Sequence, residues 1–169
     1  MIRKGSLGDL DAIVELYKAA AAQGGGLIRT QDEITKDYIQ NFLTKSLATG
    51  IILIAESENK QLIGEIHAYK GDPKVLAHNL TQLTIVVHPA FQGKGIGKLL
   101  FTTLLDDIKT SHPEILRVEL MARETNLRAL DLYKKLGFKV EGSFEKRVRV
   151  RDTFVADIAM AWFNPNFRE

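Results

Sequence analysis

The sequence predicts an α/β fold, because apolar strand-like runs alternate with segments of helical periodicity along its 169 residues. Hydrophobic residues make up 45% of the chain and charged residues 26%, which is ordinary for a globular domain. The most informative stretch is an apolar run over 83–87 that leads into a glycine loop and then a helix. At this length we expect one domain over residues 1–169 with a sizeable core.

The first half of the chain predicts two helices between strands. A short strand begins at Ile2, and Asp9 is the candidate N-cap of the first helix. The glycine-rich segment 23–26 is expected to end this helix. The other elements expected here are a helix over 31–47, a buried strand over 51–55 and its hairpin partner over 62–69.

The second half alternates strands with helices. The expected elements are a strand over 80–87, a helix over 95–109, a strand over 115–122, a helix over 126–136 that Gly137 stops, and strands over 138–140 and 153–161. Between the last two strands, the charged segment 145–152 is expected to be exposed. Its basic run 146–151 fits an exposed strand face, and a grip on an acidic substrate is the alternative.

Three alternating glycines, Gly93, Gly95 and Gly97, follow the strand and precede the helix. A loop in this position exposes backbone N–H groups, and the helix dipole adds partial positive charge, so an anion can bind there. Glycines also let the backbone come close to a ligand. We therefore expect a phosphate or pyrophosphate at this loop. Lys94 and Lys98 are expected to face it, with solvated surface charges as the alternative.

Two other phosphate-binding loops fit the glycines less well. A P-loop requires Ser or Thr after its Gly-Lys pair, whereas Leu99 follows Lys98. A dinucleotide-binding loop requires G-x-G-x-x-G, whereas this loop reads G-x-G-x-G. Glu119 has the sequence distance of a ribose-binding acid, but its strand continues over 120–122.

Two segments together resemble one known family, the GNAT N-acetyltransferases. Gln92-x-x-Gly95-x-Gly97 resembles the family's Q/R-x-x-G-x-G/A signature, and the segment 126–138 resembles its N-x-x-A-x-x-x-Y-x-x-x-G-F pattern. The resemblance is strong over about 80–142 and extends to the remainder through the order of elements. It implies a mixed, twisted sheet with helices on both faces and a strand splay that holds the CoA arm.

The resemblance implies that acetyl-CoA binds and that its acetyl group passes to a primary amine of a small molecule or a peptide. The pantetheine arm would pair with the backbone of 85–87, an N–H near Val87 would polarise the thioester carbonyl, and the Tyr133 hydroxyl would protonate the departing sulfur. A core tyrosine at 133 and a plain helix N-cap at Asn126 are the alternatives. The cofactor-binding residues implied are Ile85, Val86, Val87, Gln92, Gly93, Lys94, Gly95, Ile96, Gly97, Lys98, Asn126, Ala129 and Tyr133.

The sequence leaves the general base open. Gln82 lies in the earlier strand, where some family members have a glutamate, and a glutamine cannot accept the proton. Glu119 lies in the later strand, two residues before the expected place. Glu65 shares a strand face with His67 and is a further candidate. For each carboxylate an ordinary surface charge is the alternative. A base that acts through water, or no dedicated base, also stays open.

Composition excludes several functional classes. The chain has no cysteine, which excludes disulfides, thiolate metal sites and a cysteine nucleophile, and its four histidines lack metal-ligand spacing. A net charge of +2 does not argue for nucleic acid, and no apolar run approaches the ~20 residues of a membrane span. We expect a cytoplasmic protein without metal, nucleic-acid or membrane partners, as a monomer or homodimer. A catalytically silent acetyl-CoA sensor and a dinucleotide oxidoreductase are the rival interpretations.

Overall fold

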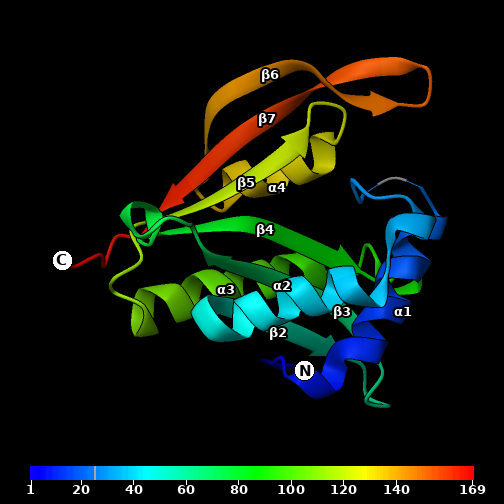
Figure 1. Cartoon of the computed structure of the whole chain (residues 1–169), viewed down its shortest axis with the longest axis horizontal. Coiled ribbons are helices and arrows are strands. Elements are labelled where there is room, and N and C mark those ends of the chain that lie inside the picture. Colours follow the sequence, from blue (N-terminus) through cyan, green and yellow to red (C-terminus); the bar gives the residue numbers. More distant parts are fainter. Residues whose placement is uncertain (25) are drawn as a thin grey trace. The chain divides into compact units, whose positions relative to one another are not determined.

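The computed structural model describes residues 1–24 and 26–169, so the predicted helix break at 23–26 lies in part outside the described residues (Figure 1). The hydrogen-bonded strand order is β1-β2-β3-β4-β5-β7-β6. β4 pairs parallel with β5 and β5 pairs antiparallel with β7, so the sheet is mixed, as predicted. The elements are β1 (Ile2–Lys4), α1 (Leu10–Ala22), α2 (Lys36–Thr49), β2 (Gly50–Glu56), β3 (Leu62–Lys70), β4 (Asn79–Val87), α3 (Ile96–Ser111), β5 (Arg117–Arg123), α4 (Leu127–Lys135), β6 (Lys139–Val150) and β7 (Thr153–Phe163).

The chain divides into two compact units. The first unit comprises Met1–Tyr69 and Thr84–Asp107, and the second comprises Lys70–Leu83 and Ile108–Glu169. β4 and α3 each begin in one unit and end in the other. In the part of the chain that the structure describes, no helix has both the length and the apolar character to cross a membrane.

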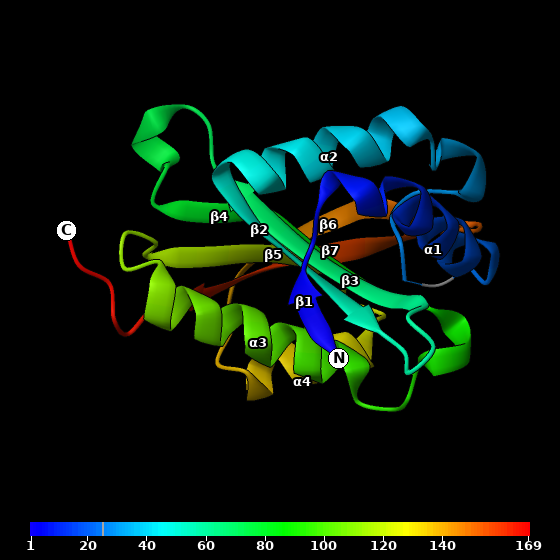
Figure 2. The same ribbon diagram turned by 90° about the horizontal axis from the view of Figure 1, so that it is seen from below.

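In the first unit, α1 and α2 lie against each other and cover one face of the sheet (Figures 1 and 2). Their apolar stripes form one core cluster with Ile52 and Ile54 of β2 and with Val86 of β4. Ile52 and Ile54 pair directly with His67 and Glu65 of β3, so both of these polar side chains face the two helices. The helix residues of this cluster are Ile13, Val14, Leu16, Tyr17, Ile39, Phe42 and Leu43.

The opposite face of β3 packs against α3. A Cβ added to Gly64 would lie 3.0 Å from Leu100 Cδ1 and 3.3 Å from Ile96 Cγ2. The glycine therefore permits a close approach of the helix to the strand. Helices thus cover both faces of the sheet in this unit, and β3 is buried along 63–68.

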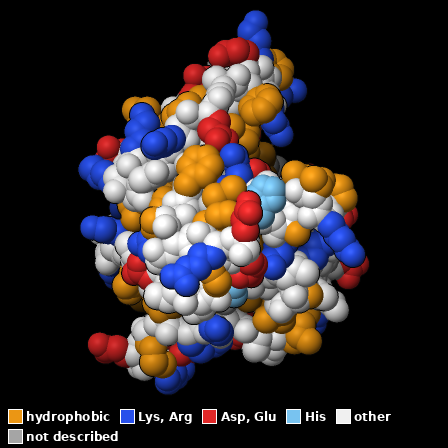
Figure 3. All heavy atoms as spheres, turned by 90° about the vertical axis from the view of Figure 1, so that its left-hand side faces the viewer, with side chains coloured by type: hydrophobic (Ala, Val, Ile, Leu, Met, Phe, Trp, Pro, Cys, Tyr) orange, Lys and Arg blue, Asp and Glu red, His pale blue; other side chains and the backbone are white. Residues whose placement is uncertain are grey.

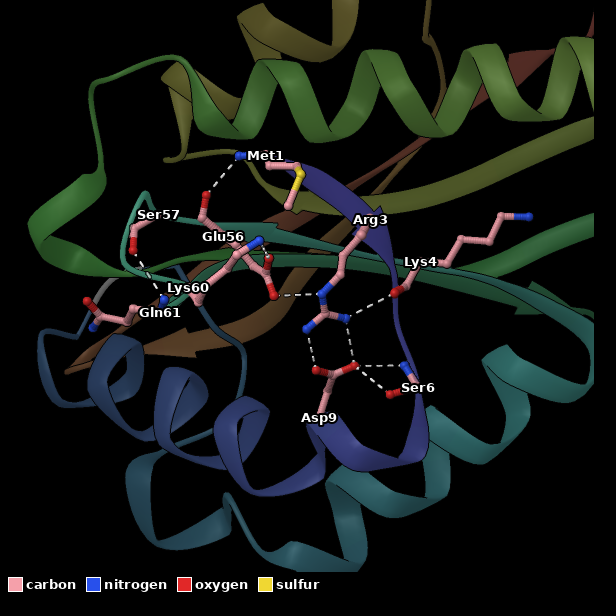
Figure 4. A network of polar contacts seen from close by, with 9 residues as sticks. All are labelled: Met1, Arg3, Lys4, Ser6, Asp9, Glu56, Ser57, Lys60 and Gln61. Carbon is pink, nitrogen blue, oxygen red and sulfur yellow. Dashed lines mark hydrogen bonds and ion pairs between the residues drawn. The ribbon is translucent and has the colours of Figure 1, made fainter.

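An ion-pair network joins β1 to the start of α1 and to the end of β2 (Figure 4). The Arg3 guanidinium donates to both carboxylate oxygens of Asp9, at 2.6 and 3.0 Å, and its Nε donates to Glu56 Oε1 at 2.7 Å. Asp9 also accepts from the backbone N–H of Ser6 at 2.8 Å. The predicted capping role of Asp9 is therefore wrong in detail, because its side chain closes the preceding 3-10 turn and makes no cap bond to α1.

The second helix begins later than predicted. Residues Gln31–Glu33 form a separate 3-10 turn, and α2 starts at Lys36. Thr35 sets this boundary because its hydroxyl accepts a hydrogen bond from the backbone N–H of Tyr38 at 3.1 Å. Apolar periodicity alone merged the turn with the helix.

In the second unit, β7 pairs with β5 over 157–163 and with β6 on its other edge. β6 is much longer than the predicted strand over 138–140, because the charged segment continues the pairing with β7. Most of this segment is exposed, as predicted. Extra β6 residues bulge between Phe144 and Val148, where Lys146 has a φ of +55°.

Two arginines of this segment lie over exposed phenyl rings. Arg147 Cζ lies 4.8 Å from the ring centroid of Phe144, and Arg149 Cζ lies 6.0 Å from that of Phe154. On the face of the molecule drawn in Figure 3, Lys and Arg side chains are interspersed with Asp and Glu side chains. The electrostatic field over that face is therefore mixed in sign.

Candidate active site

The glycine loop joins the end of β4 to the start of α3 within the first unit. Gly93 and Gly95 have φ values of +79° and +81°, a region that L-residues rarely adopt. A Cβ at either position would meet nothing within 4 Å. The reason for a glycine at these positions is therefore the backbone conformation and not a lack of space. α3 begins at Ile96, and the first N–H groups of a helix have no partner within it. The predicted anion site therefore has the required backbone.

Gly97 differs from the other two loop glycines. It lies in the first turn of α3, and its φ is not in the left-handed region. A Cβ there would make ordinary contacts with Ile85 Cδ1 at 3.7 Å and Val87 Cγ2 at 3.8 Å. A close approach of ligand to backbone is therefore the remaining reason for a glycine at this position.

Two side chains make hydrogen bonds to the backbone beside the glycine loop. The Gln92 side-chain amide donates to the carbonyl oxygen of Val87 at 3.1 Å. His88 Nδ1 accepts from the backbone N–H of Ala90 at 3.2 Å and so caps the 3-10 turn Pro89–Phe91 that leads into the loop. Gln92 thus positions the loop, and its direct contact with a cofactor stays a prediction.

The two loop lysines are both exposed but differ in surroundings. Lys94 Nζ lies 4.8 Å from the ring centroid of Phe91, and the side chain lines an open groove of about 640 Å³. The groove continues past the N-terminus and the turn between β2 and β3. Lys98 projects from the first turn of α3. Both ammonium groups can reach solvent beside the loop, which is what a phosphate partner requires.

The second motif forms α4 and its caps in the second unit. Asn126 is the N-cap, and its side-chain oxygen accepts from the backbone N–H of Ala129 at 3.3 Å. Tyr133 is 9% exposed, and burial raises the pKa of its hydroxyl to about 12. The phenol is therefore neutral near pH 7 and can donate a proton. Gly137, with a φ of +96°, ends the helix as predicted.

Glu65 is completely buried in the first unit, so its interpretation as a surface charge is wrong. Its Oε2 accepts a hydrogen bond from the Tyr17 hydroxyl at 2.6 Å, and its Oε1 lies 3.0 Å from His67 Nδ1. Burial and the charge of Glu65 raise the pKa of Tyr17 well above its ordinary value, so Tyr17 is a neutral donor. Sequence reasoning did not single out Tyr17, because its place in the apolar stripe of α1 is equally typical of a core residue.

Glu119 is partly exposed on β5 and lies in an ion-pair network. Its Oε1 is 2.9 Å from Arg117 Nε, and Arg117 also donates to both carboxylate oxygens of Glu141. Arg117 therefore offsets much of the charge that a general base would use, and the surface ion pair is the simpler role for Glu119.

The residues implied by the resemblance fall into two sets. The strand segment 85–87, the loop and helix start over 92–98, and Glu65 belong to the first unit, whereas Glu119, Asn126, Ala129 and Tyr133 belong to the second. β4 pairs with β5 at Asn79 and Leu80, and its backbone is irregular at Gln82, with a φ of +55°. The strand splay that would hold the CoA arm stays a prediction. Among the described residues, no group of three or more His, Asp or Glu side chains is placed to hold a metal ion.

Comparison with known proteins gives a consistent result. A model of the acetyltransferase (GNAT) family matches residues 11–138. The L-amino acid N-acyltransferase of Escherichia coli (strain K12) is 28% identical over 141 residues, covering 82% of this chain and 79% of that protein. The L-methionine sulfoximine/L-methionine sulfone acetyltransferase of Salmonella typhimurium is 23% identical, covering 82% of this chain and 80% of that protein. A solved putative acetyltransferase from Salmonella typhimurium with its cofactor acetyl-CoA superposes with a TM-score of 0.85 at 19% identity, covering 100% of this chain and 96% of that chain.

Proposed function

Because this chain belongs to the acetyltransferase (GNAT) family, we propose that it transfers the acetyl group of acetyl-CoA to the primary amine of a small L-amino acid or a related compound. The observation that carries the proposal is the glycine loop, whose two positive-φ glycines directly precede the N-terminus of α3. This is the geometry in which backbone N–H groups bind the oxygens of a pyrophosphate.

The chain's own residues supply the donor site. The N–H groups of 93–97 would hold the pyrophosphate, with Lys94 and Lys98 as flexible cations beside it. Gln92 keeps these N–H groups in place by its bond to Val87. When bound, acetyl-CoA supplies an activated thioester, and the backbone N–H near Val87 would donate a hydrogen bond to the thioester carbonyl. Asn126 and Ala129 are assigned to the CoA arm by the same motif.

Tyr133 is proposed as the general acid. Its phenol carries a proton throughout the physiological range, since burial raises its pKa to about 12. The CoA sulfur would otherwise leave as a charged thiolate, and the proton from Tyr133 lets it leave as a neutral thiol. Proton donation by a positioned side chain typically contributes 10²–10⁴-fold to a rate.

The acceptor class rests on the curated relatives. Two that match about four fifths of this chain are named for L-amino acids or for methionine analogues. Such acceptors carry an amine close to a carboxylate or another polar group. We therefore propose small α-amino compounds as the first acceptors to test, with polyamines and peptide N-termini as the competing classes.

Release of free CoA tests the proposal directly. A thiol reagent can detect the product without background from the enzyme, because the chain contains no cysteine. We expect release with at least one small α-amino compound at several times the rate without acceptor. If acetyl-CoA binds but no amine in the panel increases release, the chain is a silent acetyl-CoA sensor and the proposed function is wrong.

A further inference from the structure

A second functional feature lies on the helix-covered face of β3, where Tyr17, Glu65 and His67 form a buried hydrogen-bonded chain. Glu65 is 0% exposed and His67 is 2% exposed. A carboxylate in such a position needs hydrogen bonds to both oxygens, because burial without them costs several kcal/mol. The two neighbours supply these bonds, at 2.6 Å from the Tyr17 hydroxyl and at 3.0 Å from His67 Nδ1.

With Glu65 as a carboxylate, its contact assigns the nitrogen of His67 that carries the hydrogen. The Tyr17 hydroxyl donates to Oε2, so Nδ1 is the atom that faces Oε1. A carboxylate oxygen only accepts, and Nδ1 must therefore donate. A neutral imidazole that donates through Nδ1 presents Nε2 as an acceptor. Glu65 thus holds the ring in the tautomer in which a histidine can take up a proton, and it can stabilise the imidazolium that forms.

Aromatic packing fixes the plane of the ring. The Phe42 ring stacks on His67 with centroids 4.0 Å apart and planes 7° from parallel. The titratable and charged groups around the cluster come from α1, α2, β3 and the segment that precedes α2. They are Tyr17 of α1, Tyr38 and Lys45 of α2, Glu65 and Tyr69 of β3, and Arg29, which lies over the Tyr38 ring.

The hydrogen-bonded side chains Tyr17, Glu65 and His67 also lie beside the part of β4 that is proposed to hold the thioester. The backbone N–H of His88 donates to the Ile63 carbonyl at 2.8 Å, which registers β3 against β4. Val86 belongs to the same core cluster as Ile52 and Ile54, the direct partners of His67 and Glu65. The two polar side chains therefore occupy the sheet face that also carries Val86, in the same compact unit.

Resting on the proposed function, we propose that His67 accepts the proton that the acceptor amine must lose, through an intervening water, and that Glu65 is its positioning residue. The N–H bond of the ammonium breaks, water relays the proton to Nε2, and the freed lone pair attacks the thioester carbonyl. The C–S bond breaks, and the sulfur takes the proton of the Tyr133 hydroxyl. The attacking nitrogen then loses its second proton to the Tyr133 oxygen, which restores the phenol. The proton on His67 returns to solvent, so each turnover releases one proton.

The test is the pH dependence of kcat/KM for the amine at saturating acetyl-CoA. The variant His67→Asn keeps a donor toward Glu65 but removes the basic ring nitrogen, and Glu65→Gln keeps the shape but removes the carboxyl group. We expect each to lower kcat/KM by about 10²–10⁴-fold, and we expect His67→Asn to move the acid limb to higher pH, where the acceptor amine loses its own proton. The defect should shrink with an acceptor whose amine is less basic, because such an amine is already neutral.

The matched control is Tyr17→Phe, which removes the other hydrogen bond to Glu65 and leaves His67 intact. It should lower the thermal midpoint but keep the acid limb. If His67→Asn retains the wild-type profile, or loses activity equally with all acceptors, the histidine is purely structural and the inference is wrong. Absence of acetyl transfer by the wild-type chain would instead overturn the proposed function itself.

A readout on the wild-type chain needs no variant. The ¹⁵N chemical shifts of the His67 ring distinguish the two neutral tautomers. We expect the form protonated at Nδ1, and the form protonated at Nε2 would overturn the inference even if both substituted chains failed to fold.

Discussion

The side-chain amide of Gln92 donates a hydrogen bond to the carbonyl oxygen of Val87 over 3.1 Å and so joins the glycine loop to the end of β4. This bond fixes the position of the loop relative to the strand. The loop is proposed to bind the pyrophosphate, and the strand is proposed to align the thioester. Such preorganisation lowers the ordering cost of binding, because the N–H groups are already arranged before the ligand arrives.

Replacement of Gly95 by valine should abolish CoA binding while the fold persists. Its φ of +81° is a conformation that a β-branched residue avoids, so the loop must change shape. Isothermal calorimetry should detect no binding of CoA to this variant. Gly142→Ala is the matched control, because a Cβ there meets nothing within 4 Å and its φ is unexceptional. Wild-type affinity in a folded Gly95→Val chain would refute the loop assignment.

The same calorimetry should show different affinities for CoA and for pantetheine, which lacks the phosphates. Both ligands carry the arm that would pair with β4, but only CoA carries the pyrophosphate that the loop N–H groups would bind. We expect CoA to bind much more tightly than pantetheine. Added salt should reduce the difference in affinity between CoA and pantetheine, because salt screens the contacts of Lys94 and Lys98 with the pyrophosphate. Equal affinities would show that the loop contributes nothing to recognition.

Replacement of Tyr133 by phenylalanine should lower kcat by about 10²–10⁴-fold and leave the affinity for CoA near the wild-type value. The change removes one hydroxyl and keeps the ring that packs 6.0 Å from Phe138. An acyl donor with a more acidic leaving thiol should show a smaller defect, because its thiolate needs less help from a proton. An unchanged kcat where chemistry limits turnover would make Tyr133 a packing residue only.

Replacement of Asp9 by asparagine should destabilise the chain in a pH-dependent way. The Arg3 guanidinium holds the pKa of Asp9 below its ordinary value of 3.8. A lowered pKa adds stability that is fully present above pH 3.8 and disappears as the pH falls through the folded-state pKa. We expect a loss of about 1–2 kcal/mol at pH 7, discounted for the partial exposure of Arg3.

Urea unfolding of wild type, Asp9→Asn and the exposed control Glu58→Gln, followed from pH 7 to pH 2, measures this effect. The difference between wild type and Asp9→Asn should shrink toward low pH, while Glu58→Gln should match wild type throughout. A difference that stays constant over the whole range would mean that the charge of Asp9 does not stabilise the fold.

The sequence predicted the elements that carry a strong local signal. Glycines at 95 and 137 mark a loop and a helix end because only glycine readily adopts their backbone angles. The full length of β6 was missed because the apolar run that predicted the strand ends at 140, whereas pairing with β7 sets its length. The start of α2 was missed because Thr35 acts through a single hydroxyl contact that periodicity does not reveal.

The candidate site was predicted only where motifs define it. Alternation along β3 correctly placed Glu65 and His67 on one face but could not tell that face from solvent. Its burial follows from α1 and α2, which are distant in sequence, and the contact with Tyr17 spans 48 residues. Such contacts arise from tertiary packing, which local patterns do not encode.

The most direct test of the account follows the acetyl group itself. Acetyl-CoA labelled with ¹³C at the carbonyl is incubated with the chain and a small α-amino compound that promotes CoA release, and the carbonyl signal is observed by NMR. The account predicts that the thioester signal is replaced by an amide signal with the wild-type and Gly142→Ala chains, and that it persists with Gly95→Val. A wild-type reaction that yields only acetate, or an equally fast transfer by Gly95→Val, would contradict it.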